Sequence, residues 1–220
     1  MKEVICTVDV VLLTIRDDTL MVALVERGQA PFEGRLALPG GYIHADEDAS
    51  AYEAAMRVIT RKAGLTPPYL EQLSTFTGPA RDPRGWSVSI AHYALVPFDI
   101  ISKARGALRL VPVDSLPALP FDHEAMVHKA AERLRNKSQY SSLPCFLAGE
   151  VFTLPQLQRI YEVLMGEQIN KVSFRRKIGE MDMLEPLAGG FEAAGAHRPA
   201  QLYRLKSAFR QNLMMLERGL

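Results

Sequence analysis

Residues 38–65, LPGGYIHADEDASAYEAAMRVITRKAGL, contain the signals for a strand end, a turn, a loop and one helix. Pro39-Gly40-Gly41 predicts a tight turn, because proline restricts its own backbone and glycine adopts conformations that other residues avoid. Ser50 or Asp48 can cap the N-terminus of a helix, and Gly64 marks its C-terminus. We therefore expect a short strand, a glycine turn and one capped helix in this stretch.

The same stretch resembles the Nudix box, G-x5-E-x7-R-E-U-x-E-E-x-G-U, in which U is a bulky aliphatic residue. Gly41 is followed after five residues by Glu47, and the stretch closes with Gly64-Leu65. The spacer between Glu47 and Arg57 is two residues longer than the box allows. The shared order and closing dipeptide favour a Nudix-like domain over an unrelated amphipathic helix.

The residues at the metal-binding positions of the box differ from those that the family uses. Counted back from Gly64, Arg57 aligns with the box arginine and Val58 replaces the glutamate after it. Arg61 and Lys62 replace the two metal-binding glutamates. Mg²⁺ prefers oxygen ligands and is repelled by a neighbouring cation. The resemblance therefore implies a Nudix domain that is not an enzyme, holds no metal and binds a ligand without hydrolysing it.

Composition and charge are those of a globular protein that lacks an obvious partner. The chain has 220 residues, a length that suits one medium and one small domain, with 48% hydrophobic and 23% charged residues. Residues 1–150 hold 16 Lys and Arg against 18 Asp and Glu, whereas residues 151–220 hold 10 against 7. The mildly basic C-terminal part is compatible with a polyanionic partner.

The two cysteines, Cys6 and Cys145, are too few for a disulfide scaffold. We expect two reduced thiols in a cytoplasmic protein. The N-terminal sequence lacks the pattern of a signal peptide, and no apolar run is long enough to cross a membrane.

Residues 1–138 are expected to form the Nudix-like domain, an α/β/α sandwich of the α+β class. The residue patterns predict strands over 5–15, 20–26, 36–38, 69–76, 87–97 and 109–112. A helix is predicted over 122–137, because four apolar residues fall near one face: Ala125, Met126, Ala130 and Leu134. Asp122-His123 is interpreted as the N-terminal cap of this helix with an uninvolved histidine, in preference to a catalytic relay pair.

Residues 139–150 are expected to be a linker, and residues 151–220 a winged helix-turn-helix domain. Thr153 can cap a helix that ends near Gly166. A second helix follows, in which Phe174, Ile178 and Met181 form an apolar stripe surrounded by basic residues. Strands over 184–187 and 201–205 can form the wing. The helix order, the basic helix and the hairpin favour DNA binding over a merely solvated charged face.

The predicted DNA contacts come from the second helix and the wing. Lys171 and Ser173, near the helix N-terminus, are candidates for contact with base edges. Arg175, Arg176 and Lys177 are predicted to hold phosphates, with Arg198 from the wing as a further contact.

The whole chain resembles the Nudix-related transcriptional regulators of NAD metabolism. The matching segments are TVDVVLLT, LALPGGYI, TPPYLEQLSTF, RDPRGWSVSI, LPFDHEAMV, FTLPQLQRIYEVLMG, SFRRKI and HRPAQLYRL. The resemblance implies a homodimeric repressor of NAD biosynthesis or salvage genes, which leaves its operator DNA on binding ADP-ribose or a related NAD-derived nucleotide and requires no cofactor. His197 replaces the glycine that usually precedes Arg-Pro-Ala in the wing.

The resemblance also implies which residues form the effector pocket. Arg27 and Arg84 can pair with a pyrophosphate, and backbone N–H groups of the glycine turn can approach its oxygens. Trp86 or Phe32 can stack on adenine. The full predicted set is Arg27, Phe32, Pro39, Gly40, Gly41, Arg84, Gly85 and Trp86.

Two alternatives stay open at this point. The chain could be an active hydrolase of ADP-ribose or another nucleoside diphosphate derivative, with metal ligands drawn from Asp46, Glu47, Asp48 and Glu53. It could also be a regulator of a pentose pathway that responds to a sugar.

Overall fold

The computed structural model describes residues 3–192 and 199–211, and it divides into two compact units. Unit 1 comprises residues 1–16 and 20–133, and unit 2 comprises residues 17–19 and 134–220. The boundary between the units, after residue 133, lies inside the helix His123–Ser138, whereas our predicted boundary after residue 138 coincides with the end of this helix.

Unit 1 is built on one sheet with the strand order β3-β2-β1-β6-β5, in which β4 also pairs with β1 and β7 with β2. β1 runs parallel to β6, and β4 antiparallel to β1. The strands are β1 (Ile5–Arg16), β2 (Thr19–Glu26), β3 (Leu36–Ala37), β4 (Gly40–Tyr42), β5 (Tyr69–Gly78), β6 (Ser87–Leu95) and β7 (Leu108–Pro112).

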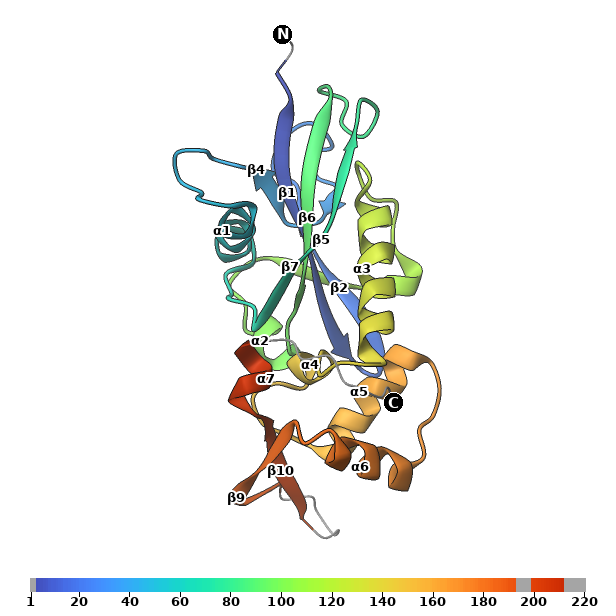
Figure 1. Ribbon diagram of the computed structural model, residues 1–220. Helices are drawn as coiled ribbons and strands as arrows, with labels where there is room; N and C mark the ends of the chain where they lie inside the picture. Colours follow the sequence, from blue (N-terminus) through green and yellow to red (C-terminus); the bar gives the residue numbers. More distant parts are fainter. Residues whose placement is uncertain (1–2, 193–198, 212–220) are drawn as a thin grey trace. The chain divides into compact units, whose positions relative to one another are not determined.

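Helices cover both faces of this sheet. Figure 1 shows α1 (Ala51–Ala63) on one side of the strands and α3 (His123–Ser138) on the other. Two short helices, α2 (Phe98–Ile101) and the 3-10 helix η1 (Val113–Ser115), connect the later elements. The predicted α/β/α sandwich is confirmed.

Each helix buries an apolar face against the sheet. Under α1, the side chains of Ala55 and Ile59 pack with Val10, Leu12 and Ala94 of the strands, all of them 0% exposed. Under α3, the fully buried side chains include Met126, Val127 and Ala130. This packing fixes the ends of both helices relative to the strands, and those ends carry residues of the candidate site.

The ends of α1 lie where the sequence predicts them. The Ser50 hydroxyl accepts a hydrogen bond from the backbone N–H of Glu53. At the other end, Gly64 adopts the left-handed conformation with φ 67°, which a residue with a side chain avoids. α1 therefore starts and stops at fixed points, and its last turn has a defined direction.

Unit 2 is a small winged helix domain. Its sheet has the order β8-β10-β9. The core residues Leu157, Tyr161 and Phe174 are fully buried, and the Tyr161 and Phe174 rings lie 5.6 Å apart. The elements are α4 (Cys145–Ala148), β8 (Phe152–Thr153), α5 (Leu154–Met165), α6 (Lys171–Glu180), β9 (Leu184–Glu192), β10 (Ala200–Leu205) and α7 (Ser207–Gln211).

The two main helices of unit 2 are capped by side chains at their N-termini. Thr153 and Gln156 form a reciprocal capping box at the start of α5, and Gly166 ends this helix in the left-handed conformation. The Asn170 side chain accepts hydrogen bonds from the N–H groups of Val172 and Ser173 at the start of α6. The cap at Thr153 agrees with the prediction, and Asn170 is an addition to it.

Two segments differ from the prediction. Gly40–Tyr42 is not a free turn, because it pairs with β1 as strand β4. Residues 139–150 are not an open linker, because they contain α4 and bury Leu143 and Cys145. Ser141 is tolerated there because its hydroxyl donates to the carbonyl of Lys137.

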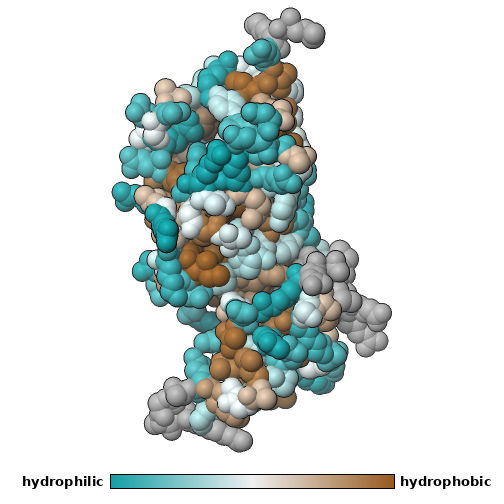
Figure 2. Space-filling model, turned by 90° about the vertical axis from the view of Figure 1, so that its left-hand side faces the viewer, coloured by the Kyte–Doolittle hydropathy of each residue, from teal (hydrophilic) through white to brown (hydrophobic). Residues whose placement is uncertain are grey.

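The surface is mainly polar on the face that carries α1. Figure 2 shows that hydrophilic side chains cover most of this face, and that apolar side chains lie there in separate patches. In the described part of the chain, no helix is both long enough and apolar enough to span a lipid bilayer.

Candidate functional site

A pocket in unit 1 is formed by six parts of the chain. They are β1, the segment after β2, the segment from Leu38 through β4, the last turn of α1, the loop between β5 and β6, and the start of α3. The lining residues are Thr7, Asp9, Arg27, Gln29, Ala30, Leu38, Gly40, Gly41, Tyr42, Lys62, Arg81, Asp82, Arg84, Phe121 and His123.

The lining carries more positive than negative charge. Four of its residues are cations, and two are carboxylates, Asp9 and Asp82. Two of these cations have carboxylate partners, because Arg84 pairs with Asp82 and Arg81 pairs with Asp122, which lies outside the lining. The cations are Arg27, Lys62, Arg81 and Arg84.

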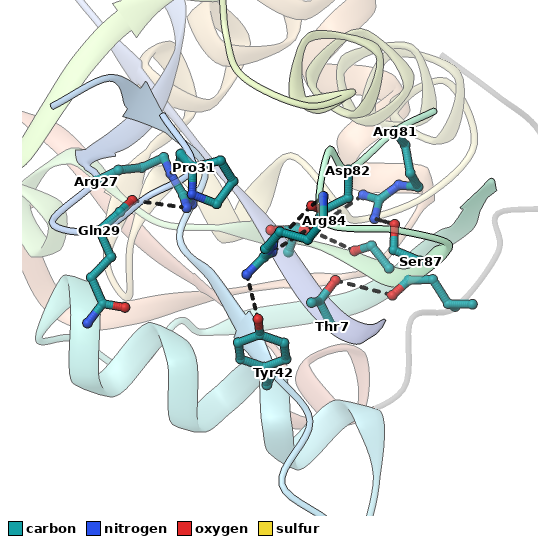
Figure 3. Close-up of polar contacts among 12 residues, drawn as sticks. Thr7, Arg27, Gln29, Pro31, Tyr42, Arg81, Asp82, Arg84 and Ser87 are labelled. Carbon is teal, nitrogen blue, oxygen red and sulfur yellow. Dashed lines mark hydrogen bonds and ion pairs between the residues drawn. The ribbon is translucent and has the colours of Figure 1, made fainter. Parts of the chain in front are cut away.

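Arg84 is held by a carboxylate and by a tyrosine. Its guanidinium forms an ion pair with the buried Asp82 at 2.7 Å and donates a hydrogen bond to the Tyr42 hydroxyl. Figure 3 shows the Arg84 side chain reaching toward Tyr42. Burial would raise the pKa of Asp82, but the hydrogen bonds from Arg84 hold that pKa below its usual value. Arg84 is therefore a fixed cation at the edge of the pocket.

Arg27 is held without a carboxylate. Its Nε donates to the carbonyl of Pro31 at 2.8 Å, and its guanidinium lies 4.9 Å from the centre of the Phe121 ring. Partial burial and then the charge of Arg84 lower the pKa of Arg27. In the described part of the chain, no carboxylate oxygen lies within 4.0 Å of this guanidinium. Arg27 is thus positioned, and its charge is available to an anion.

A buried polar network lies beneath the pocket. The Asp9 carboxylate accepts a hydrogen bond from the Ser89 hydroxyl at 2.7 Å and lies 3.4 Å from Nε2 of His123 and 3.9 Å from Arg81. Arg81 in turn binds Asp122 through two hydrogen bonds, at 2.7 and 2.9 Å. Burial would raise the pKa of Asp9, but His123, Ser89 and Arg81 hold it below its usual value.

The contacts of this network show that our interpretation of His123 was wrong, and they explain why a glycine occupies position 40. His123 is not an uninvolved residue at a helix start, because it is 2% exposed and lies between Asp9 and the Leu38 backbone. A Cβ at Gly40 would lie 1.9 Å from Oδ1 of Asp9. Glycine is therefore required at this position by the close approach of Asp9, and not by a turn conformation.

The structure brings together half of the predicted pocket residues. Arg27, Gly40, Gly41 and Arg84 belong to the lining, whereas Phe32, Pro39, Gly85 and Trp86 do not. The Phe32 ring contacts Phe121 edge to face at 5.0 Å. Trp86 is 45% exposed, and its carbonyl accepts a hydrogen bond from the N–H of Ile5.

Sequence reasoning missed other lining residues, of which Asp9 had a detectable signal. Asp9 is an acidic residue inside the apolar run TVDVVLLT, and a buried carboxylate requires partners. Lys62 was noted only as a lost metal ligand. Tyr42, Arg81 and Asp82 carried no comparable signal.

The residues at the box positions of α1 have three different surroundings. Val58 is buried, and its side chain lies beneath Gly41. Arg61 is exposed and pairs with Glu47 at 3.1 Å. Lys62 lines the pocket, and its ammonium donates a hydrogen bond to the carbonyl of Gly40.

The acidic residues considered as metal ligands do not converge on the pocket. Asp48 binds Arg57 through two hydrogen bonds, which lower the pKa of Asp48 to about 2. The Glu53 carboxylate accepts a hydrogen bond from the N–H of Ala49, and Asp46 is exposed. Among the described residues, no three His, Cys, Asp or Glu side chains are arranged to hold a metal ion.

The basic helix α6 has one buried and one exposed face. Phe174 and Ile178 are buried, as predicted from the apolar stripe. Of the predicted DNA contacts, Lys177 is half-buried, and the others on the helix are exposed: Lys171, Ser173, Arg175 and Arg176. Val172, which sequence reasoning did not single out, is 76% exposed beside them. Arg198 and His197 lie outside the described residues.

Comparison with known proteins identifies both parts of the chain. The model of the NUDIX domain matches residues 7–130, and the model of the NrtR DNA-binding winged helix domain matches residues 144–205. The protein named ADPR responsive transcriptional repressor NtrR, of Acinetobacter baylyi, is 36% identical over 203 residues, which cover 90% of this chain and 80% of that protein.

Two solved structures of Shewanella oneidensis NrtR are similar as well, each with 38% sequence identity. The complex of NrtR with a 27mer DNA has a TM-score of 0.88 and covers 98% of this chain and 99% of that one. The complex of its NUDIX domain with ADP ribose has a TM-score of 0.54 and covers 61% of this chain and 90% of that one. The chain belongs to the family of NUDIX-domain proteins that carry an NrtR DNA-binding winged helix domain.

Proposed function

We propose that this protein is a transcriptional repressor that binds operator DNA through its winged helix domain and releases it when ADP-ribose occupies the pocket of unit 1. The observation that carries the proposal is the Acinetobacter relative, which is named as an ADPR-responsive repressor and matches 90% of this chain. The pocket and the basic helix α6 give each half of the proposal a physical basis.

The charge of the pocket suits a diphosphate. Arg27 and Lys62, the two cations of the lining for which the described residues hold no ion-pair partner, match the two negative charges of a pyrophosphate linkage. Arg27 keeps guanidinium N–H donors for phosphate oxygens, whereas the Arg84 guanidinium, which is bonded to Asp82 and Tyr42, adds positive charge. The aromatic rings of Tyr42 and Phe121 in the same lining can pack against a ribose or a base.

We propose that the pocket binds its nucleotide without hydrolysing it. Val58 and Arg61 supply no ligand for a metal ion at the box positions, and Glu47 is engaged by Arg61. Asp48 is engaged by Arg57. The helix therefore lacks the carboxylates on which a Nudix hydrolase depends, and the alternative of an active hydrolase has no converging ligand set in the described residues.

We further propose that the repressor acts as a homodimer on a palindromic operator. A single winged helix offers few base contacts, so two copies bound to two half-sites are needed for high affinity. Cross-linking and gel filtration of the protein with and without operator DNA test this point. A monomer in both measurements contradicts it.

Operator release is measured by fluorescence anisotropy on a labelled duplex that the protein has selected from random sequences. ADP-ribose should weaken this binding, because an effector shifts an equilibrium by its different affinity for the two states. NAD, ribose and xylose are run in parallel. Release by a pentose alone favours the sugar-responsive alternative, and metal-dependent formation of AMP favours the hydrolase.

Arg27→Met and Arg35→Met form a matched pair for the same assay. Arg27 lines the pocket, whereas Arg35 is exposed outside it and donates a hydrogen bond to the carbonyl of Ala118. We expect Arg27→Met to keep operator binding and to require at least roughly tenfold more ADP-ribose for release. Arg35→Met should behave as the wild type. Equal behaviour of the two variants excludes this pocket as the effector site.

A further inference from the structure

Lys62 extends from the last turn of α1 into the pocket. Its ammonium donates a hydrogen bond to the carbonyl of Gly40, in the strand β4 that lines the same cavity. Gly64 ends the helix two residues later, and Gly40 is held against Asp9, so both ends of this contact are fixed by the fold. The position of the ammonium is therefore set by the backbone.

The charge of Lys62 is not neutralised by a partner of its own. In the described part of the chain, no carboxylate oxygen lies within 4.0 Å of its ammonium. Asp9, whose charge acts on it, is already engaged by Ser89 and His123. Lys62 as a whole is an exposed residue, but partial desolvation of its ammonium lowers the pKa of Lys62, and the charge of Arg27 lowers this pKa further. Two cations, Lys62 and Arg27, thus face one cavity without ion-pair partners.

The neighbouring cation of the helix makes a useful contrast. Arg61 also replaces a glutamate of the Nudix box, but its side chain is 60% exposed and pairs with Glu47. Arg61 does not line the pocket, whereas Lys62 does. Of the two substitutions, only the one at Lys62 reverses the charge inside the cavity.

We propose that the Lys62 ammonium supplies, inside the pocket, the positive charge that a divalent cation supplies in a metal-dependent Nudix site, so that this chain binds the diphosphate of its effector without a metal ion. The proposal rests on the proposed function, because it concerns the same nucleotide. An ammonium has three N–H donors, and the carbonyl of Gly40 takes one of them. Two donors are left for phosphate oxygens, and the same charge repels Mg²⁺.

The residues present do not fit the metal that the fold family implies. A Mg²⁺ ion needs several oxygen ligands in nearly octahedral geometry, and the pocket offers the carboxylates Asp9 and Asp82. The Asp9 carboxylate already contacts His123 in the buried network, and the Asp82 carboxylate forms an ion pair with Arg84. A lysine in the lining of such a site therefore takes the place of the metal ion and does not help to bind it.

Isothermal titration calorimetry with ADP-ribose tests the proposal on the full-length protein. The titration is carried out once with excess EDTA and once with excess Mg²⁺. We expect the wild type to bind in both buffers with affinities that agree within about twofold. Binding that needs Mg²⁺ overturns the inference but keeps the proposed function. No binding in either buffer overturns the proposed function itself.

Lys62→Met and Arg61→Met are the matched variants, because each removes one cation from the same helix turn while keeping an unbranched side chain. Lys62→Met should weaken ADP-ribose binding in EDTA roughly ten- to hundredfold, the worth of a charge-assisted hydrogen bond. Arg61→Met should bind as the wild type does. Unchanged thermal unfolding shows that both variants are folded. If Lys62→Met binds ADP-ribose as tightly as Arg61→Met, the Lys62 ammonium does not hold the diphosphate.

Discussion

Nε2 of His123 lies 3.4 Å from Oδ1 of Asp9, and both side chains are buried beneath the pocket. Nδ1 of the same ring accepts a hydrogen bond from the backbone N–H of Leu38 at 3.1 Å. A neutral ring with Nδ1 as acceptor carries its proton on Nε2, which then points to Asp9. One imidazole thus connects the start of α3 to β1 and to the chain just before the glycine strand β4.

Replacing this histidine should destabilise the protein. His123→Phe leaves the buried N–H of Leu38 without an acceptor and removes one partner of the Asp9 carboxylate. We expect a loss of about 1–3 kcal/mol in the free energy of unfolding, measured by urea denaturation. His128→Phe on the same helix is the control, because this side chain is 56% exposed and should change stability by at most about 0.5 kcal/mol. Similar losses in the two variants contradict a structural role of the His123 contacts.

The sequence predicted the structure best at helix ends, where residues close together in the chain determine the conformation. The N-cap at Ser50, the stop at Gly64 and the cap at Thr153 are local, because each depends on residues within one helical turn. Gly40–Tyr42 could not be predicted as a strand in this way. Its pairing with β1 depends on residues more than thirty positions earlier, and its glycine is required by the Asp9 side chain.

The ion pair between Asp48 and Arg57 should make stability depend on pH in the acid range. The hydrogen bonds from Arg57 lower the pKa of Asp48 to about 2, whereas an unfolded chain has an aspartate pKa of about 3.9. Because the pKa is lower in the folded state, ionised Asp48 stabilises the fold at pH values above the pKa of the unfolded chain. This stabilisation is lost as the pH falls through about 2.

The difference in the free energy of unfolding between wild type and Asp48→Asn should therefore be constant above about pH 5 and shrink as the pH falls from about 4 toward 2. Urea denaturation at a series of pH values measures it. Asp46→Asn, at an exposed neighbouring position, should differ little from the wild type throughout. A difference for Asp48→Asn that does not vary with pH would show that its ionised form is not the stabilising one.

The candidate site was predicted only in part, for a physical reason. The family pattern led to Arg27, Gly40, Gly41 and Arg84, which do line the pocket. It did not lead to Lys62, because the sequence shows only that a glutamate of the Nudix box is missing there and not where the lysine side chain lies. In the sequence, the lysine marks a lost metal ligand. In the structure, the helix directs its charge into the cavity, whereas the adjacent Arg61 is paired outside it.

The two thiols should differ in reactivity, and this tests the packing of residues 139–150. Cys6 is exposed, whereas Cys145 is 2% exposed and burial raises its pKa to about 12. At pH 8, a disulfide reagent should modify one thiol in the native protein and both after unfolding in urea. Cys6→Ser should leave the native protein unreactive. Rapid modification of this variant would show that the segment is an open linker, as its composition suggests.

Arg176 should contribute to DNA affinity mainly through phosphate contact. It lies on the exposed face of α6, 3.8 Å from Glu180, and the two side chains are 71% and 68% exposed. An ion pair at such exposure contributes little, so Arg176 is available to a phosphate while Glu180 repels one. Arg176→Ala should lower the slope of log K against log salt by about 0.9, because one counterion fewer is released.

Two further variants separate this effect from a general loss of binding. Glu180→Gln should tighten binding, because it removes a negative charge near the backbone of the DNA. Lys171→Ala, near the N-terminus of the helix, should instead reduce the discrimination between the selected duplex and a scrambled one. Both changes lie on exposed positions and leave the buried Phe174 and Ile178 in place, so the fold should be kept. If Arg176→Ala, Glu180→Gln and Lys171→Ala all bind DNA as the wild type does at every salt concentration, α6 is a solvated face and the DNA contacts lie elsewhere in the chain.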